Sequence, residues 1–298
     1  MPTADLSATG NRVEVLDDGR LVVGQPFVVL LQKRGLDSFE AVMTCKDGEM
    51  MRSVPGRSTV KMELQWPDGA KQIAFLKRYE PEYISNVERL LRLIHWPGAG
   101  DEALHEWNAI WQMRASRFNT AVPIAVGQEK HAGIVTRSFL LTAEIVGGIA
   151  AHDYTRTLDA KTRGKLAAQI ADLTRRFHSA GFAHQDHYLS HIFIVPPQKG
   201  GDDSQFFYID LQRLISPRFL RKRWIVKDLG MLGYSAQLAG ATNKDLMRFC
   251  EGYFQKKQFS EDERRIIRRV VSRMKCLHRR KPKYDAIWNE PGVRPPNV

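Results

Sequence analysis

The stretch that most constrains the fold of this chain is residues 181–213. It opens with a glycine typical of a helix end, followed by a loop dense in ionisable side chains. Two short apolar runs, 192–195 and 206–209, then flank a turn rich in Pro, Gly and Asp, which predicts a hairpin. Asp186 precedes the first run and Asp210 follows the second. The sequence therefore predicts two carboxylates at the two ends of one hairpin.

Protein kinases hold a catalytic base and a magnesium ligand in this way. His184, Gln185 and Asp186 fill the first three positions of the pattern His-Arg-Asp-x-x-x-x-Asn. His191 falls on the Asn position, and Asp210 takes the place of the Asp in Asp-Phe-Gly. Phosphoryl transfer is the leading interpretation, with Asp186 as the base and with Asp210 and His191 as ligands of Mg²⁺.

The two departures, Gln185 and His191, indicate a particular kinase family. His-x-Asp-x-Tyr-x-x-His, followed by a strand ending in Ile-Asp-Leu-x-Arg, resembles the lipopolysaccharide kinase (Kdo/WaaP) family. These kinase-fold enzymes phosphorylate inner-core sugars of lipopolysaccharide, and a His at the Asn position is usual among them. The resemblance covers about residues 36–288. It implies ATP and Mg²⁺ as cofactors and a heptose or Kdo of a lipopolysaccharide core glycolipid as the acceptor.

The region from 24 to 79 has the pattern of a small antiparallel sheet. Strand-like runs separated by Asp-Gly turns occur at 27–31, 59–64 and 72–76. Residues 52–59 lie where a phosphate-covering loop would lie, although this loop has a single glycine. Since the family carries a similar Gly-Arg-x-Thr segment, the resemblance implies that Gly56, Arg57 and Ser58 contact the phosphates of ATP.

Lys77 ends an apolar strand-like run, as the phosphate-binding Lys of a kinase does. Leu104, Trp107 and Trp111 recur at helical spacing and predict a helix over 101–115. Glu106 lies beside this apolar stripe. Phe-Leu-Lys and Glu-Trp-x-Ala-Ile both resemble the family's sequences, so Lys77 and Glu106 are expected to form the ion pair of a kinase small lobe.

The expected fold class is α+β, a two-lobed protein-kinase-like fold with a β-rich N-lobe and a mainly helical C-lobe. A strand at 138–141 leads into a Gly pair, as a hinge would, and places the adenine against the backbone of Ala143, Glu144 and Ile145. A helix over about 159–180 opens the large lobe. The predicted parts are a poorly ordered leader over 1–23, the N-lobe over 24–145, the C-lobe over 146–290 and a disordered tail over 291–298.

Basic residues dominate the chain after Asp210. Overall, 45 Lys and Arg against 33 Asp and Glu give a net charge of +12, which favours anionic partners. Arg213, Arg218 and Arg221 are expected to face a phosphorylated sugar acceptor. The segment 221–229 resembles in outline the family's Arg-Trp-x-x-Lys-Asp-Leu, and Asp228 is expected to brace the catalytic loop from the following helix.

A second basic stretch follows the capping box at 260–263 and has one apolar face with Arg and Lys crowding the rest. It either lies on an anionic membrane or packs on the lobe. The chain has neither a signal-peptide pattern nor a long apolar run. Three widely spaced cysteines favour a reducing compartment. We expect a cytoplasmic protein, peripheral on the cytoplasmic face of the inner membrane of a Gram-negative bacterium, with no specific nucleic-acid partner.

Two alternatives stay open. The first is a metal-dependent hydrolase built on a cluster of one acid and three imidazoles: His184, Asp186, His187 and His191. The second is a kinase-like pseudoenzyme that binds nucleic acid or membrane through its basic face. Retention of the four kinase residues argues against the pseudoenzyme: Lys77, Glu106, Asp186 and Asp210.

Overall fold

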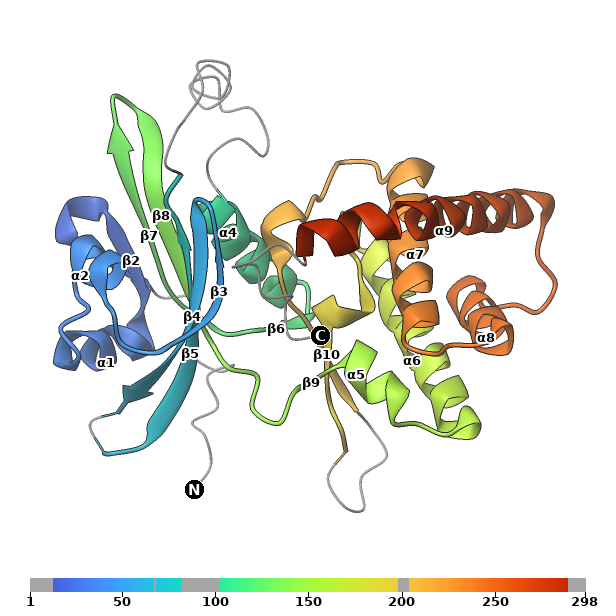
Figure 1. Ribbon diagram of the computed structural model, residues 1–298, viewed down its shortest axis with the longest axis horizontal. Helices are drawn as coiled ribbons and strands as arrows, with labels where there is room; N and C mark the ends of the chain where they lie inside the picture. Colours follow the sequence, from blue (N-terminus) through green and yellow to red (C-terminus); the bar gives the residue numbers. More distant parts are fainter. Residues whose placement is uncertain (1–12, 67, 82–101, 198–203, 289–298) are drawn as a thin grey trace. The chain divides into compact units, whose positions relative to one another are not determined.

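The computed structural model describes residues 13–66, 68–81, 102–197 and 204–288, and for 281–288 the backbone alone. The described chain divides into two compact units. One contains the residues up to Ala115 together with 120–145, and the other contains 116–119 and 146–288. The first is β-rich and the second is mainly helical (Figure 1). This is the α+β, kinase-like fold that the sequence predicts.

The first unit is built on an antiparallel sheet with the strand order β1-β2-β7-β8-β5-β4-β3. Its strands are β1 (Val13–Leu16), β2 (Leu21–Gly24), β3 (Glu49–Val54), β4 (Arg57–Gln65), β5 (Lys71–Tyr79), β7 (Pro123–His131) and β8 (Ile134–Ala143). Its helices are α1 (Val28–Lys33), α2 (Phe39–Thr44) and α4 (Glu102–Ala115), and short 3-10 turns η1 (Asp17–Gly19) and η2 (Gln25–Phe27) join the first elements.

Two predictions near the N-terminus are wrong. Residues 27–31 were expected as a strand, but they end η2 and begin α1. Leu30 and Leu31 are buried while Val29 is 52% exposed, so this apolar run faces the core on one helical side. A short apolar run does not distinguish a strand from a buried helix. The leader expected over 1–23 is also ordered where it is described, because residues 13–24 pair as β1 and β2.

The sheet divides the small unit into two layers. Alternate residues of β5, such as Ala74 and Leu76, join α1 and α2 in one hydrophobic core. The helix α4 packs against β5, β7 and β8 and buries Trp107 and Ile110 (Figure 1). This is the helix predicted over 101–115, and residue 101, where a cap by Asp101 would be placed, lies outside the described residues.

The second unit combines a four-stranded sheet with a set of helices. The strand order is β6-β11-β10-β9, with β6 (Asn119–Thr120), β9 (Ile149–Ala150), β10 (Ile192–Val195) and β11 (Gln205–Tyr208). The predicted hairpin is present, because β10 and β11 pair antiparallel. The helices are α5 (Ala151–Arg156), α6 (Ala160–Ser179), α7 (Lys222–Leu238), α8 (Asn243–Phe254) and α9 (Glu261–Trp288), with 3-10 turns η3 (Leu189–His191) and η4 (Leu211–Arg213).

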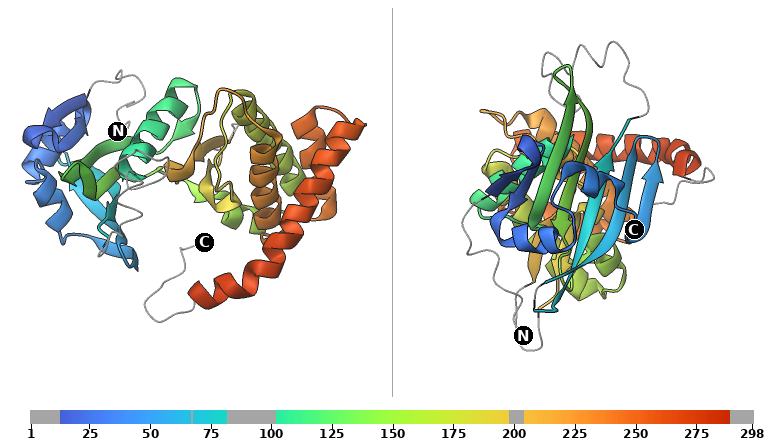
Figure 2. Two further views of the ribbon diagram at one scale, coloured as in Figure 1. Left: turned by 90° about the horizontal axis from the view of Figure 1, so that it is seen from above. Right: turned by 90° about the vertical axis from the view of Figure 1, so that its left-hand side faces the viewer.

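The long basic helix α9 packs on its own unit. Figure 2 shows α9, in red, as one continuous rod beside α7, in orange. Met274 and Leu277 are buried there, so the apolar face is turned toward the neighbouring helices. Of the two placements left open by the sequence, the described part of α9 has the packed one. Among the described helices, none is both long and apolar enough to cross a bilayer.

Candidate active site

In the small unit, the structure brings Lys77 and Glu106 together. Lys77 Nζ lies 2.7 Å from Glu106 Oε1 and 3.0 Å from Oε2. The Lys comes from β5 and the Glu from α4, and the carboxylate side chain is only 3% exposed. An ion pair at this depth fixes the amine in one position, since both carboxylate oxygens accept from it. This geometry is the one a phosphate-binding kinase Lys requires.

The expected phosphate loop is the β3–β4 turn. Gly56 has φ +74°, and a Cβ there would lie 3.1 Å from the Cα of Pro81. The turn therefore favours glycine both for its backbone conformation and for the lack of space. The Gly56 carbonyl accepts the Glu80 N–H at 2.8 Å. The Arg57 guanidinium lies over the Tyr79 ring, 5.2 Å from its centroid. Ser58 pairs with Arg78 across β4 and β5. Contact of Gly56, Arg57 and Ser58 with phosphate stays a prediction.

The expected hinge begins where β8 ends. The Ala143 N–H donates to the Val122 carbonyl at 2.8 Å, and the Glu144 N–H donates to the Ile73 carbonyl at 2.9 Å. Among the described residues, no carbonyl accepts from the Ile145 N–H. Contact of Ala143, Glu144 and Ile145 with adenine stays a prediction, and the Ile145 N–H is the donor of the three without a backbone acceptor in the described residues.

In the large unit, Asp228 of α7 braces the catalytic loop. Its carboxylate accepts the backbone N–H groups of His184 at 2.7 Å and of Gln185 at 2.9 Å. Asp228 is fully buried. Gln185 has φ +68°, a left-handed conformation that is strained for a residue with a Cβ. These two bonds hold the strained residue that directly precedes Asp186, as the sequence predicts for Asp228.

Asp210 follows β11 in a left-handed conformation, with φ +57° and ψ +55°. Such backbone strain is concentrated at functional sites. The buried His184 anchors this end of the hairpin, because its Nε2 lies 3.0 Å from the Ile209 carbonyl. The Ile209 N–H in turn donates to the His191 carbonyl at 3.1 Å. The contact with the Ile209 carbonyl gives His184 a structural role at the end of the hairpin.

His191 connects the two carboxylate segments and has the geometry of a metal ligand. Its Nδ1 lies 2.7 Å from the Asp186 carbonyl, which can only accept, so Nδ1 carries the hydrogen. The Nε2 lone pair is therefore left toward Asp210, whose Oδ2 lies 3.7 Å away. A nitrogen and an oxygen at this separation can share one cation. Asp210 supplies the carboxylate oxygen that Mg²⁺ prefers, and the imidazole of His191 would add a nitrogen donor beside it.

The ring of His184 is stacked 5.7 Å from those of His187 and His191, but the four residues of the hydrolase alternative do not form one group of metal ligands in the described part of the chain. His187 turns inward, where ring nitrogens of His178 and His187 and the Asp228 carboxylate lie within 4.8 Å of one another. Both nitrogens of His178 are already used, Nδ1 at 2.8 Å from Tyr253 Oη and Nε2 at 3.4 Å from Asp228. Burial lowers the pKa of His187 to about 3, so its imidazole is neutral. His178, His187 and Asp228 thus form a buried group that supports the catalytic loop from the interior of the large unit.

Of the three expected substrate arginines, Arg213 is the one placed beside Asp186, with Nη1 3.5 Å from Oδ2. Arg218 lies over the ring of Phe219, 5.4 Å from its centroid. Arg221 is the exposed residue before α7. The residue missed by the sequence analysis is Lys227, whose Nζ donates to Gln185 Oε1 at 2.9 Å. The sequence feature that could have indicated Lys227 is its place directly before Asp228, the residue expected to brace the catalytic loop.

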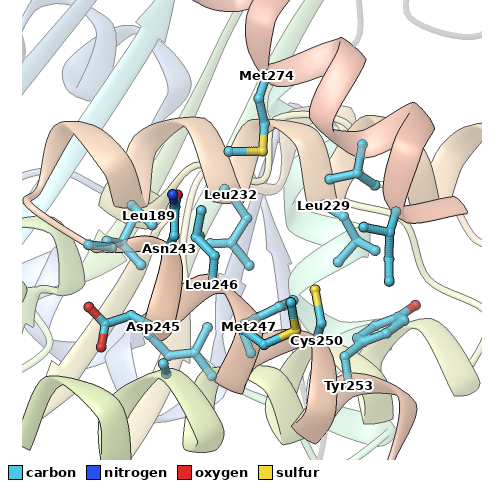
Figure 3. Close-up of a pocket in the computed structure, with 18 of the residues that line it drawn as sticks. Leu189, Leu229, Leu232, Asn243, Asp245, Leu246, Met247, Cys250, Tyr253 and Met274 are labelled. Atoms are coloured by element: carbon cyan, nitrogen blue, oxygen red, sulfur yellow. The ribbon is translucent and has the colours of Figure 1, made fainter. Parts of the chain in front are cut away.

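The large unit also encloses an apolar pocket of about 280 Å³ (Figure 3). Helices α6, α7, α8 and α9 all contribute apolar side chains to its wall, among them Ile170, Leu232, Leu246, Val270 and Met274. The ion pair between Arg163 and Asp245, 2.8 Å long, supplies charged groups to its lining. The apolar face of α9 therefore packs on α7 and lines part of this pocket.

Comparison with known proteins agrees with this geometry. The model of the lipopolysaccharide kinase (Kdo/WaaP) family matches residues 46–253, more than half of the chain. The lipopolysaccharide core heptose(I) kinase WaaP of Escherichia coli is 30% identical over 236 residues, covering 77% of this chain and 85% of the relative. WaaP of Pseudomonas aeruginosa is 28% identical over 277 residues, covering 90% and 99%.

A solved structure of WaaP in complex with acyl carrier protein superposes with a TM-score of 0.62 at 26% identity, over 89% of this chain and 98% of that one. The matched family region contains Lys77, Glu106, Asp186 and Asp210, the four residues that the sequence predicts for a kinase site. The relatives are kinases, and neither the hydrolase nor the pseudoenzyme is favoured by them. The chain is a phosphotransferase that belongs to the lipopolysaccharide kinase (Kdo/WaaP) family.

Proposed function

We propose that this chain transfers the γ-phosphoryl group of ATP to a sugar hydroxyl of the lipopolysaccharide inner core, with the first heptose as the leading acceptor. The sugar is carried over from the named activity of the relatives. One observation of this chain carries the phosphoryl-transfer part. Asp186 and Asp210 stand at the two ends of the hairpin, and the imidazole of His191 connects them.

The residues have separate tasks in this mechanism. Asp186 accepts the proton of the sugar hydroxyl, and the His191 N–H together with the Asp228 brace holds its backbone in place. Lys77, fixed by Glu106, binds phosphate oxygens of ATP. The Ile145 N–H is offered to the adenine. Asp210 and His191 would hold Mg²⁺, which when bound offsets the negative charge of the phosphates.

Two substitutions test this assignment. Asp186→Ala should lower turnover by roughly 10²–10⁴-fold with nucleotide binding largely kept, because only proton transfer is lost. Asp210→Ala should weaken nucleotide binding in the presence of Mg²⁺ as well. Transfer of ³²P from ATP to purified lipopolysaccharide core, with nucleotide titration in parallel, separates the two effects. Wild-type turnover in Asp186→Ala would remove this residue from the mechanism.

A second partner follows from the solved relative, which was captured with acyl carrier protein. The apolar pocket of Figure 3 has the chemistry to take the acyl chain that such a carrier bears, and each buried methylene contributes about 0.8 kcal/mol. The acylated carrier protein should therefore raise the melting temperature of this chain, and the carrier without its acyl group should not. Leu246→Trp, which fills the pocket, should remove that difference. Equal shifts from both carriers would exclude the pocket as the acyl site.

The acceptor is a glycolipid, so the enzyme must work at a membrane surface. The proposed location is the cytoplasmic face of the inner membrane. Arg268, Arg269, Arg279 and Arg280 lie on α9 and are exposed in the described part of the chain. Each Lys or Arg close to an anionic bilayer contributes about 1 kcal/mol. With the apolar face of α9 packed inward, this attraction would be electrostatic and reversible.

A further inference from the structure

The side chain before the catalytic Asp differs from the protein-kinase pattern and has a different partner. Gln185 stands where that pattern has Arg, so the loop itself carries no cation at this position. The Oε1 of Gln185 instead accepts from Lys227 Nζ at 2.9 Å. Lys227 belongs to α7, 42 residues further along the chain. A second element therefore supplies an amine next to Asp186.

The position of this amine is tied to that of the catalytic loop. Asp228 follows Lys227 directly, and its carboxylate accepts the Gln185 N–H at 2.9 Å. Gln185 is thus held twice by one short segment of α7, through its backbone by Asp228 and through its side chain by Lys227. Groups fixed in this way need little reorganisation when charge develops beside them, which is the condition for electrostatic catalysis.

The charge of Lys227 is available for an anion. Its hydrogen-bond partner is a neutral amide, and among the described residues no carboxylate lies within ion-pair distance of its Nζ. Lys227 is half-buried. Burial lowers the pKa of its ammonium group, the positive charges of Arg213 and Arg273 act in the same direction, and the charges of Asp186 and Asp228 oppose them. A half-buried cation with a neutral partner gains free energy when an anion binds it.

Arg213 is a second cation at the catalytic loop, and unlike Lys227 it lies at the Asp186 carboxylate. Its side chain is 61% exposed, and its Nη1 lies 3.5 Å from Asp186 Oδ2. An exposed guanidinium on a 3-10 turn is suited to a variable acceptor, since solvent screens it and it can move. The half-buried Lys227 is suited to a fixed charge in the reaction. The two cations, one at Asp186 and one at the preceding Gln185, are therefore suited to different tasks.

We propose that Lys227, presented by Gln185, binds the phosphoryl group during its transfer to the acceptor oxygen beside Asp186. This proposal rests on the proposed function. In the step, a bond forms between the acceptor oxygen and the γ-phosphorus while the bond from that phosphorus to the β–γ bridging oxygen breaks. The electron pair leaves with ADP, and the hydroxyl proton goes to Asp186. Lys227 keeps its protons and offsets the charge of the phosphoryl oxygens. Gln185 is the positioning residue.

A transition-state mimic tests the role of Lys227 without knowledge of the sugar. ADP with Mg²⁺ and aluminium fluoride imitates the phosphoryl group in transfer, whereas ADP with Mg²⁺ lacks it. Lys227→Met should weaken binding of the first by about 10²-fold, the scale of one lost electrostatic donor, with binding of the second within about twofold. Lys227→Arg should restore part of the loss. Lys222→Met, on the exposed part of the same helix, is the matched control and should change neither.

Gln185 is tested by its dependence on Lys227. Gln185→Leu should lower turnover in the wild-type background and have little further effect in the Lys227→Met background, as expected for residues acting as a unit. Gln185→Glu should lower turnover too, because its carboxylate neutralises the amine, while the free energy of unfolding is kept or raised. A merely structural role predicts the opposite, with the Leu variant unstable and the Glu variant active.

The possible results separate the role of Lys227 from the assignment of the chain as an ATP-dependent kinase. Equal binding of ADP–aluminium fluoride by wild type and Lys227→Met would overturn the role of Lys227 and leave the kinase assignment intact. Failure of the folded wild type to bind ADP with Mg²⁺ in any form would instead overturn the proposed function itself. Loss of both ligands in a folded Lys227→Met variant would show that the residue supports nucleotide binding in general, which also contradicts the proposal.

Discussion

Asp228→Asn should damage both stability and catalysis, although the two side chains have nearly the same shape. The wild-type carboxylate accepts two buried backbone N–H groups, from His184 and from Gln185. Asparagine has a single carbonyl oxygen, so one of these N–H groups must face the new NH₂ donor. A hydrogen bond to a charged group is worth about 1.5–3 kcal/mol, and an unsatisfied buried donor costs about 1–3 kcal/mol. The expected loss in free energy of unfolding is about 2–4 kcal/mol.

The effect on catalysis follows from the backbone of Gln185. Its left-handed conformation costs about 1–2 kcal/mol and persists because Asp228 holds it. When that bond is weakened, the residue can relax and carry Asp186 with it. A displacement of about 1 Å at a reacting group costs about 10²-fold in rate. Turnover should fall on this scale with little change in nucleotide affinity.

The free energy of unfolding should also depend on pH differently in wild type and in Asp228→Asn. Burial by itself raises the pKa of Asp228, but the hydrogen bond from His178 acts in the opposite direction, and the net result is a lowered pKa. A carboxylate with a lowered folded-state pKa contributes stability above its unfolded value, about 3.8, and loses that contribution as the pH falls through the folded value. The stability gap between wild type and Asp228→Asn should therefore narrow below about pH 4.

Urea unfolding followed by circular dichroism at neutral and acid pH measures this gap, and a phosphate-transfer assay measures turnover. Asp172→Asn on α6 is the matched control, because Asp172 is 49% exposed and paired with Arg175 and Arg176 at the surface. Its loss should stay within about 1 kcal/mol. If Asp228→Asn costs no more than the control, the two N–H bonds do not brace the loop.

Three further outcomes are expected. His187→Leu should raise the free energy of unfolding by about 1–3 kcal/mol, because neither ring nitrogen of this buried His has a partner among the described residues; destabilisation in urea would show that a polar group is needed there. His191→Asn should keep Mn²⁺ binding measured by electron paramagnetic resonance, whereas His191→Leu should lose it, and equal binding by both would make His191 a structural residue. Exchange of four α9 arginines for Glu (Arg268, Arg269, Arg279 and Arg280) should abolish salt-sensitive co-sedimentation with anionic liposomes while transfer to a soluble core sugar continues; retained sedimentation would place the membrane contact elsewhere.

Much of the local structure could be predicted from the sequence, because its signals are local. The apolar stripe of α6 predicts that helix and the structure confirms it, while the cap by Asp159, whose side chain accepts from the N–H groups of Lys161 and Thr162, is found in the structure. The capping box before α9 is present, with Ser260 and Glu263 exchanging backbone and side-chain bonds. Two apolar runs and a turn likewise predict the hairpin that has Asp186 and Asp210 at its ends, and the structure contains it. Caps, periodicity and turns act over a few residues, so the sequence displays them directly.

The tertiary structure decided what depends on distant partners. Residues 28–31 are helical, and their buried side chains Val28, Leu30 and Leu31 pack in the core of the small unit. The apolar composition of this run does not show whether it packs as a helix or as a strand. The histidines of the catalytic loop have different partners, with His187 near His178 and Asp228 and with His191 near Asp210. The amine of Lys227 meets Gln185 across 42 residues of sequence. Such contacts form only when burial brings separate elements together, so no local pattern specifies them.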